Sequence, residues 1–529
     1  MVFDPFKSCF LDPTNFRYMM HKFIKALILL WTMSTYEEML EISSQLRNLA
    51  RAISLLSWDE RTYLPEGALE GRSETKAELS QMYHKKLTSD KTKRVVEELN
   101  KESVQAELNE KEKAAVREMT RDFERRYEVP EELIKEMSKV STKAQSAWEK
   151  AREKSDFEMF LPHLEKQIEL KKKMAEHIGY ENEPYDALVD EYEPGFTAKK
   201  IEKVFEPMKK ELTSIATEIF SKDDPGENIF EGKKFDIETQ KKICREIADQ
   251  FGYDFGHGRL DNAVHPFTIG MDDDVRITNR YNEDNLNSLF SLMHETGHAL
   301  YEQGIPEELY GHPLGKGISM GYHESQSRLW ENFVGRSPEF IEYLFPKLCD
   351  HYPRLEDHSK EGFYERINRV KPTFIRVEAD EVTYNLHIAL RFDIELAMFR
   401  DKIEPEEART VWENKMEEYL DIVPEDPAKG VLQDVHWSAG QFGYFPSYAL
   451  GNLYAAQIFN EIHEEIDGLG DKIREGDFDE LRRWLRQNIH QYGRKYRAKE
   501  ITKRLTGESL NEKYHIEYLK DKYGSIYNI

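Results

Sequence analysis

Two histidines and a glutamate in the stretch SLMHETGHAL (291–300) have the types and spacing of a metal-dependent hydrolytic site. Positions four apart on a helix share one face, so His294 and His298 can direct two imidazoles at one cation. Glu295 lies about 100° around the helix from His294, where its carboxylate can reach a water on that cation without ligating it. Such a carboxylate can accept the water's proton and pass it to a leaving amine. The alternative is a helix that carries two histidines by chance.

A third ligand is needed, because a catalytic zinc has three protein ligands and one open position. In the stretch 321–335, apolar residues such as Leu329 and Trp330 predict a buried helix with Glu324 in its first turn. A carboxylate at an apolar helix start needs a stabilising partner, and a metal is one. Two alternatives remain: His323 is a rival ligand, and the helix dipole also favours a carboxylate at an N-terminus.

An arginine further along the chain has a planar guanidinium that suits recognition of a carboxylate. Arg376 lies in KPTFIRVEADEVTYNLHIAL (371–390), which predicts a half-buried helix that begins after Pro372. The simpler interpretation is a pair between Arg376 and Asp380 on one helix face.

The stretch 433–457 is dense in glycine, histidine and tyrosine. Glycines let backbone approach a ligand closely, and a His or Tyr donor can stabilise the oxyanion of a tetrahedral intermediate. His436 is the first candidate for this catalytic role, with Tyr444 and Tyr448 as alternates whose order the sequence leaves open. Aromatic packing is the alternative for each of them.

The elements that must position these residues are mostly helices. Apolar residues recur at helical spacing along 39–56 and 201–219, and these faces are expected to pack in the core. Between 225 and 282 glycine, aspartate and aromatic residues replace that pattern. HPFTIG (265–270) and VRITNRY (275–281) predict short strands just before the histidine helix.

Three polar residues belong to this short β region. Asp274 and Arg276 are expected to brace the site from a strand beside a groove. His265 is a candidate for binding substrate, and the alternative is that it only caps a turn.

The composition limits the binding partners and the cellular compartment that we expect for this protein. The 529-residue chain has a net charge of -25, and an acidic surface repels phosphates, so we expect no nucleic acid partner. Three cysteines, far apart and without a CxxC pair, favour a reducing cytoplasm over a disulfide framework. The apolar run within 22–33 is too short to span a bilayer, which takes about 20 residues, so no membrane partner is expected.

The first 32 residues lack the charge density of the rest of the chain. We interpret residues 1–32 as a non-native or poorly ordered extension, with Met33 as the natural start, and residues 33–529 as one domain. The alternative for the N-terminal segment is an ordinary amphipathic helix.

Several motifs, in one order, resemble the carboxypeptidase Taq family of metallocarboxypeptidases. The chain carries HPF, DVRIT, HETGH, HESQ, IRVEAD and GVLQDVHW, which begin at 265, 274, 294, 323, 375 and 430. The early LLSWDERTYLPEGALEGR is also similar to the family's N-terminal region. The resemblance covers about 34–529, and residues 1–32 have no counterpart in it.

This resemblance implies a nearly all-α, two-lobed body with a deep substrate groove, distantly similar to neurolysin and angiotensin-converting enzyme. It implies zinc, or cobalt in some members, held by His294, His298 and Glu324, with Glu295 as the general base. Arg376 would contact the substrate's C-terminus. The implied activity is removal of single residues from peptide C-termini, broad in preference and poor next to proline, by a homodimer.

Other functions remain to be weighed against this one. An oligo-endopeptidase could use the same zinc machinery, because that machinery does not dictate where a peptide is cut. A non-catalytic peptide-binding protein would not need Glu295. A purely structural zinc site is disfavoured, because such sites are usually rich in cysteine.

Overall fold

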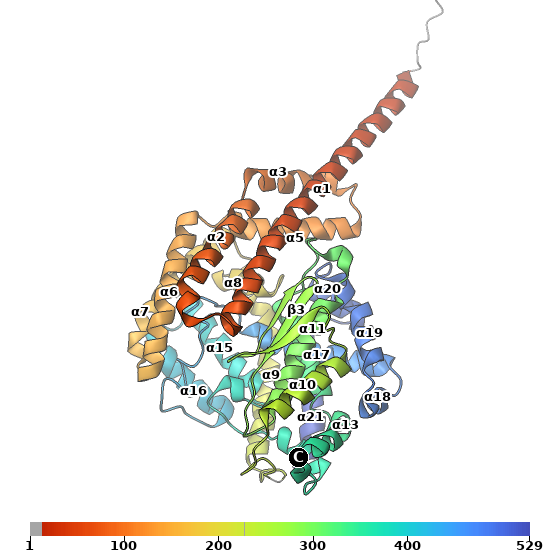
Figure 1. Cartoon of the computed structure of the whole chain (residues 1–529). Helices are drawn as coiled ribbons and strands as arrows, with labels where there is room; N and C mark the ends of the chain where they lie inside the picture. Colours follow the sequence, from red (N-terminus) through yellow and green to blue (C-terminus); the bar gives the residue numbers. More distant parts are fainter. Residues whose placement is uncertain (1–12, 227) are drawn as a thin grey trace, which may run out of the picture.

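Helices make up most of the protein, with one small sheet near the centre of the chain (Figure 1). The computed structural model describes residues 13–226 and 228–529. The helices before the sheet are α1 (Pro13–Thr62), α2 (Leu69–Leu87), α3 (Asp90–Leu99), α4 (Glu102–Gln105), α5 (Glu110–Tyr127), α6 (Glu131–Lys154), α7 (Leu161–Ile178), α8 (Pro184–Tyr192), α9 (Ala198–Phe220) and α10 (Ile237–Phe251).

The remaining helices follow the sheet and complete the body. They are α11 (Asn287–Gly304), α12 (Met320–Arg328), α13 (Pro338–His351), α14 (Lys360–Ile367), α15 (Tyr384–Phe399), α16 (Ala408–Leu420), α17 (Pro446–Glu465), α18 (Leu469–Glu475), α19 (Asp479–Asn488), α20 (Ala498–Thr506) and α21 (Lys513–Tyr527). The mostly helical fold class predicted from the sequence is therefore confirmed.

The sheet has three strands: β1 (Gly258–Asn262), β2 (Thr268–Met271) and β3 (Asp274–Asn279). β3 is central, parallel to β1 and antiparallel to β2, with Val275 and Ile277 fully buried. β2 and β3 match the two predicted strands, while β1 was not predicted. One side of the sheet packs against α11, so the β element directly supports the helix that carries the histidines (Figure 1).

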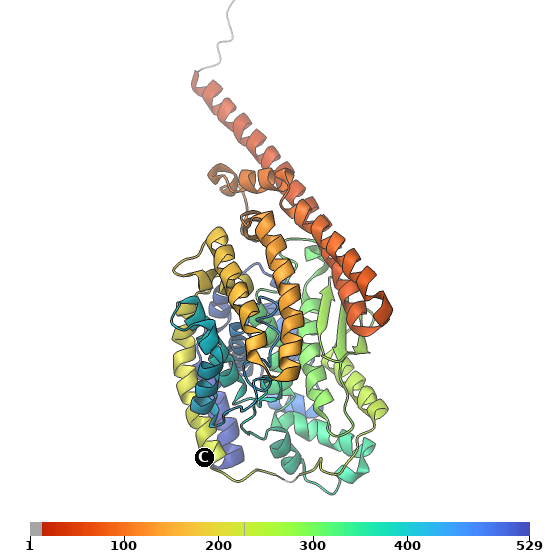
Figure 2. The ribbon, with the colours of Figure 1, turned by 90° about the vertical axis from the view of Figure 1, so that its left-hand side faces the viewer.

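The buried apolar residues form two separate clusters among the described residues. The smaller one joins α1, α3 and α5, and also takes in Ile305, Leu309 and Leu314 from the segment after α11. The larger one contains most of the remaining core, including residues of α11, α12, α15 and α17. The second half of α1 runs beside the sheet (Figure 2), where Arg47 donates to Asp272 at 2.7 Å and Arg51 to Asp273 at 2.6 Å.

The first part of α1 extends away from this body (Figure 1). Residues 1–12 of the predicted extension lie outside the described residues, and 13–32 belong to α1. In the described part of the chain, every helix is too short or too polar to cross a bilayer.

One helix prediction was wrong. The segment after Pro372 is irregular apart from a short 3-10 turn at Arg376–Glu378, and α15 begins only at Tyr384. The Asp380 carboxylate accepts the backbone N–H groups of Val382 and Thr383, both at 3.0 Å. This side chain satisfies backbone donors at the start of α15, which favours a helix start after Asp380 rather than before it.

Candidate functional site

Helix α11 presents His294, Glu295 and His298 from an otherwise apolar helix. Leu292, Met293 and Ala299 are fully buried, whereas the His294 and His298 side chains keep 18% and 17% of their exposure. The histidine face is therefore the part of this helix that a small ligand can reach.

A close helix contact brings α12 to this face. A Cβ on Gly297 would lie 2.5 Å from the Gln326 carbonyl oxygen, and a Cβ on Gly451 would lie 2.5 Å from Cγ of Glu324. Both distances are shorter than real side chains allow, so α12 can sit between α11 and α17 only because these positions are glycine. Glu324 is fixed by this packing one turn beyond the N-terminus of α12, deeper than the predicted first turn.

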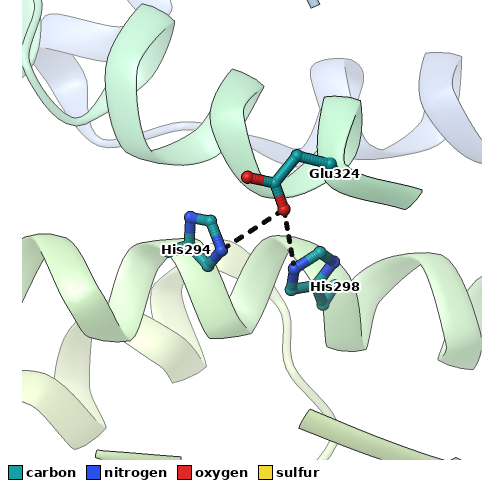
Figure 3. A group of neighbouring side chains, drawn as sticks. All are labelled: His294, His298 and Glu324. Atoms are coloured by element: carbon teal, nitrogen blue, oxygen red, sulfur yellow. Dashed lines mark ion pairs between the residues drawn. The ribbon is translucent and has the colours of Figure 1, made fainter. Parts of the chain in front are cut away.

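Glu324 points at both histidines (Figure 3). Its Oε2 lies 3.7 Å from Nε2 of His294 and 3.5 Å from Nε2 of His298. One ligand atom from each of these residues falls within 4.8 Å of the others, and among the described residues this is the one such group of three. Two imidazoles and one carboxylate are the donors of a catalytic zinc site, so the residues present fit a divalent cation.

Further charges orient this donor set. Arg328 donates from Nε to Oε1 of Glu324 at 2.8 Å, which leaves Oε2 to face the imidazoles. Nδ1 of His294 is 2.9 Å from Oε2 of Glu331, which also accepts from Nη1 of Arg328 at 3.2 Å. On the far side of His298, Nδ1 is 2.7 Å from Nδ1 of His323. His323 is outside the donor group, so the structure favours Glu324 over this rival.

The ionisation states also suit a cation. Burial opposes the charge on Glu324, but Arg328 and the two histidines outweigh it and hold the pKa of Glu324 well below its usual range. Burial lowers the pKa of His298 to about 4, so this ring is neutral. Burial also disfavours charge on His294, but Glu324 and Glu331 raise its pKa. The carboxylates thus favour positive charge at the point between the ligand atoms.

Glu295 lies beside the donor group and is held by the sheet. Its Oε2 accepts the Thr268 hydroxyl at 2.7 Å, and the same hydroxyl is 2.9 Å from the Glu295 backbone oxygen. Burial raises the pKa of Glu295, against the opposing effects of His294 and Thr268. A carboxylate with a raised pKa accepts a proton more readily near neutral pH, as a general base must.

Comparisons with known proteins agree with this geometry. Residues 38–523 match the model of the carboxypeptidase Taq (M32) metallopeptidase family. The chain belongs to this family. It is 39% identical to carboxypeptidase 1 of Bacillus subtilis over 497 residues, 93% of this chain and 99% of that protein. It is 38% identical to thermostable carboxypeptidase 1 of Thermus thermophilus over 506 residues, again 93% and 99%.

Solved structures are similar as well. The M32 carboxypeptidase of Deinococcus radiodurans has a TM-score of 0.91 at 34% identity, over 94% of this chain and 100% of that chain. The Pyrococcus furiosus carboxypeptidase has a TM-score of 0.89 at 38% identity, over 92% and 99%. Membership of the M32 family makes the chain a peptide hydrolase of the metallocarboxypeptidase class.

A second polar cluster of this M32 peptidase surrounds Arg376, which is only 6% exposed. Its Nε and Nη2 donate to Oδ1 of Asp434 at 3.1 and 2.8 Å, and Nη1 donates to the Tyr384 hydroxyl at 3.1 Å. Oδ2 of Asp434 accepts from Nε of Arg391 at 2.7 Å. The simpler Arg376–Asp380 pair is therefore wrong, because Arg376 bonds to a carboxylate 58 positions along the chain.

His436, Tyr444 and Tyr448 lie together beside Arg376. Nε2 of His436 is 3.3 Å from the Tyr448 hydroxyl, the two tyrosine rings are 5.1 Å apart, and Arg376 lies 5.0 Å from the Tyr448 ring. Burial is the main cause of a raised pKa for both tyrosines, and Glu324 contributes to it. Both hydroxyls thus stay protonated, and the Glu324 carboxylate is near enough to raise their pKa values.

The predicted residues of the β region separate into two groups. Arg276 and Asp274 form an ion pair at 2.7 Å on β3, and the Arg276 guanidinium lies 4.4 Å from the Trp58 ring on α1. These contacts join β3 to α1, and the expectation that both residues brace the site stays a prediction. His265 is exposed in the connection between β1 and β2.

Sequence reasoning missed five residues that complete the site. Arg328 and Glu331 follow Glu324 at helical spacings of four and seven, so a search along that face would have found them. Tyr384 contacts Arg376 through its hydroxyl and lies 4.5 Å from the Arg328 guanidinium, which joins the two clusters. No local pattern links Arg391 to Asp434.

Proposed function

We propose that this protein is a zinc-dependent carboxypeptidase that releases single amino acids from peptide C-termini, with broad preference and poor release next to proline. The observation that carries the proposal is the convergence of His294, His298 and Glu324, with the general base Glu295 one residue along α11. Two nitrogen donors and one oxygen donor suit zinc, and cobalt accepts a similar set.

A divalent cation held by these three residues would polarise the scissile carbonyl and acidify the attacking water. Glu295 accepts a proton from that water and returns it to the amine nitrogen that leaves. The Thr268 hydroxyl keeps Oε2 of Glu295 in place during both transfers. The backbone of Glu295 is supported from behind, because α11 packs on β2 and β3.

Hydrogen-bond donors beside Arg376 would stabilise the oxyanion that develops on the scissile carbonyl. His436 is 8% exposed and burial lowers its pKa to about 4, so it acts as a neutral ring. Its contact with the Tyr448 hydroxyl couples the two groups, and a protonated phenol is a good donor to an oxyanion. We assign this role to His436 and Tyr448, with Tyr444 packed against them as the alternate.

Arg376 is the proposed receptor for the substrate's terminal carboxylate. A guanidinium has five N–H bonds. Asp434 and Tyr384 occupy three of them, so two remain for a substrate. Asp434 and Tyr384 also fix the orientation of the guanidinium, which lowers the entropy cost of recognition. His265, exposed on the β1–β2 connection, is a proposed contact for the rest of the peptide.

The proposal extends to the setting of the enzyme. We also propose that residues 33–529 form one two-lobed domain with a groove, that the enzyme is a homodimer, and that it is cytoplasmic. These proposals rest on the family resemblance and the composition. Gel filtration with light scattering tests the dimer.

The test compares an N-blocked dipeptide with the same dipeptide amidated at its C-terminus. The intact chain, loaded with Zn²⁺, should release the C-terminal amino acid from the free acid only. A chelator should stop this release and Zn²⁺ should restore it. Equal cleavage of the amidated peptide would contradict the assignment and favour an endopeptidase on the same scaffold.

A further inference from the structure

The two metal-site histidines are supported in different ways. His294 reaches a carboxylate directly, because its Nδ1 is 2.9 Å from Oε2 of Glu331. His298 reaches one only through another ring: its Nδ1 is 2.7 Å from Nδ1 of His323, whose Nε2 is 2.8 Å from Oε1 of Glu302. Glu302 lies one turn beyond His298 on α11, so the chain of contacts leaves the helix at His298, passes through α12 and returns to α11.

The geometry around His323 holds its ring in this position. The ring lies 4.8 Å from the His298 ring and 5.1 Å from the Tyr301 ring. A Cβ on Gly317 would be 3.0 Å from Cδ2 of His323, and a Cβ on Gly270 would be 2.3 Å from Oε2 of Glu302. Both histidine and carboxylate therefore occupy space that side chains at two glycine positions would fill.

The hydrogen positions follow from the ligand role of His298. Its Nε2 faces the cation site and must carry a lone pair, so in the neutral ring the proton is on Nδ1. Nδ1 of His298 then donates to Nδ1 of His323, whose own proton is on Nε2 and is donated to Glu302. The reverse direction would place a proton on Nε2 of His298 and block the ligand atom.

We infer that His323 is a positioning residue for the metal site, which orients His298 and fixes its tautomer by connecting it to the Glu302 carboxylate. This inference rests on the proposed metal function. Both nitrogens of His323 are used in the contacts with His298 and Glu302, a chain that we call the relay, so His323 does not ligate the cation. Partners behind a metal-bound histidine raise its basicity and hold its ring, and their loss costs about 10- to 100-fold in metal affinity.

The test measures Zn²⁺ affinity of the full chain by competition with a chelator of known affinity. His323→Phe keeps a ring but removes the acceptor, and should weaken Zn²⁺ binding by about 10- to 100-fold. His323→Asn can place Oδ1 where Nδ1 stood, so it should retain most of the affinity. Glu302→Gln should weaken binding less than His323→Phe, and the double variant should be no weaker than His323→Phe alone, because both changes interrupt one chain of contacts.

A matched control is His515→Phe, a buried histidine on α21 that is 1% exposed and belongs to no part of the proposed site. It should leave Zn²⁺ affinity unchanged. If His323→Phe does not fold, Glu302→Gln decides the matter, since it keeps the size of the side chain, and His323→Asn shows whether an acceptor for His298 is enough.

Three results would overturn the relay. Unchanged affinity in His323→Phe and Glu302→Gln, with normal binding in the wild type, would refute it while leaving the proposed function intact. Loss of a histidine ligand from the zinc X-ray absorption spectrum of His323→Asn, which keeps the acceptor for His298, would make His323 a ligand. Absence of Zn²⁺ binding by the wild type would refute both proposals.

Discussion

The metal centre and the Arg376 cluster lie side by side but are built in opposite ways. The metal centre rests on two regular helices, where spacing along α11 and close packing of α12 set the positions of its three donors. The Arg376 cluster is assembled from irregular segments, helix α15 and the start of α17, and its geometry depends on ion pairs between residues far apart in the chain.

The difference assigns a separate task to each region. Helical backbone holds ligand atoms rigidly, which metal binding and proton transfer require. Irregular segments carry side chains from several directions toward one point, which suits recognition of a peptide end. Tyr384 connects the regions, since its ring contacts Arg328 and its hydroxyl contacts Arg376. Changes at the metal ligands or at Glu295 should therefore abolish catalysis, and changes at Arg376 should alter which bond is cut.

The largest effect is expected from loss of a metal ligand. His298→Ala removes one of three donors, so Zn²⁺ content and peptide hydrolysis should both fall to background, as chelation of the wild type should also achieve. Atomic absorption and amino-acid release measure the two quantities. His177→Ala, an exposed histidine at the end of α7, is the control and should behave as wild type. Full activity in His298→Ala would refute the metal centre.

Replacement of the general base should come next. Glu295→Gln keeps the size of the side chain and its bond to Thr268 but cannot accept a proton. We expect kcat to fall by about 10²- to 10⁴-fold, with Zn²⁺ content unchanged. Steady-state kinetics and metal analysis of the same sample check this. A variant that loses its metal would show that Glu295 is a ligand instead.

A smaller effect should distinguish the two tyrosines beside His436. Tyr448→Phe removes the hydroxyl beside His436 and should lower kcat by about 10²- to 10³-fold, with little change in KM. Tyr444→Phe should lower kcat by less than about 10-fold, because we place it outside the oxyanion pair. Kinetics on one peptide substrate compare them. A larger fall in kcat for Tyr444→Phe than for Tyr448→Phe would exchange their roles.

The smallest expected effect concerns the anchor of α12. Glu193 is fully buried and accepts the Gly321 N–H, and burial raises its pKa to about 7. A carboxyl whose pKa is higher in the folded state than in the unfolded state contributes fully to stability at pH values below the unfolded-state pKa. That contribution is lost as the pH rises through the folded-state pKa, which is about 7 for Glu193. The free energy of unfolding of the wild type should thus fall by up to about 3 kcal/mol relative to that of Glu193→Gln between about pH 5 and 8.

Calorimetry at the two pH values measures this difference through Tm. The Tm values of wild type and Glu193→Gln should be similar near pH 5, and the variant should be the more stable near pH 8. An equal Tm difference at both pH values would mean that Glu193 does not titrate in this range.

The grouping of His294 and His298 could be predicted from the sequence, because a helix converts a spacing of four into a shared face. Glu324 could also be found, since apolar neighbours placed it on a buried helix. The surroundings of Arg376 could not be predicted, because Asp434 and Arg391 reach it from other segments and Asp380 delays the start of α15. The strand β1 was missed because GRLDN lacks the alternation of apolar residues that marks a strand.

The division of tasks between the two regions is tested most directly by the ratio of kcat/KM for a free peptide to kcat/KM for the same peptide amidated at its C-terminus. In Arg376→Gln this ratio should fall by roughly 10- to 100-fold, with Zn²⁺ content unchanged and Asp434 still paired with Arg391. Arg400→Gln, an arginine held by Glu183 and Glu202, should keep the wild-type ratio. An unchanged ratio in Arg376→Gln would contradict the account.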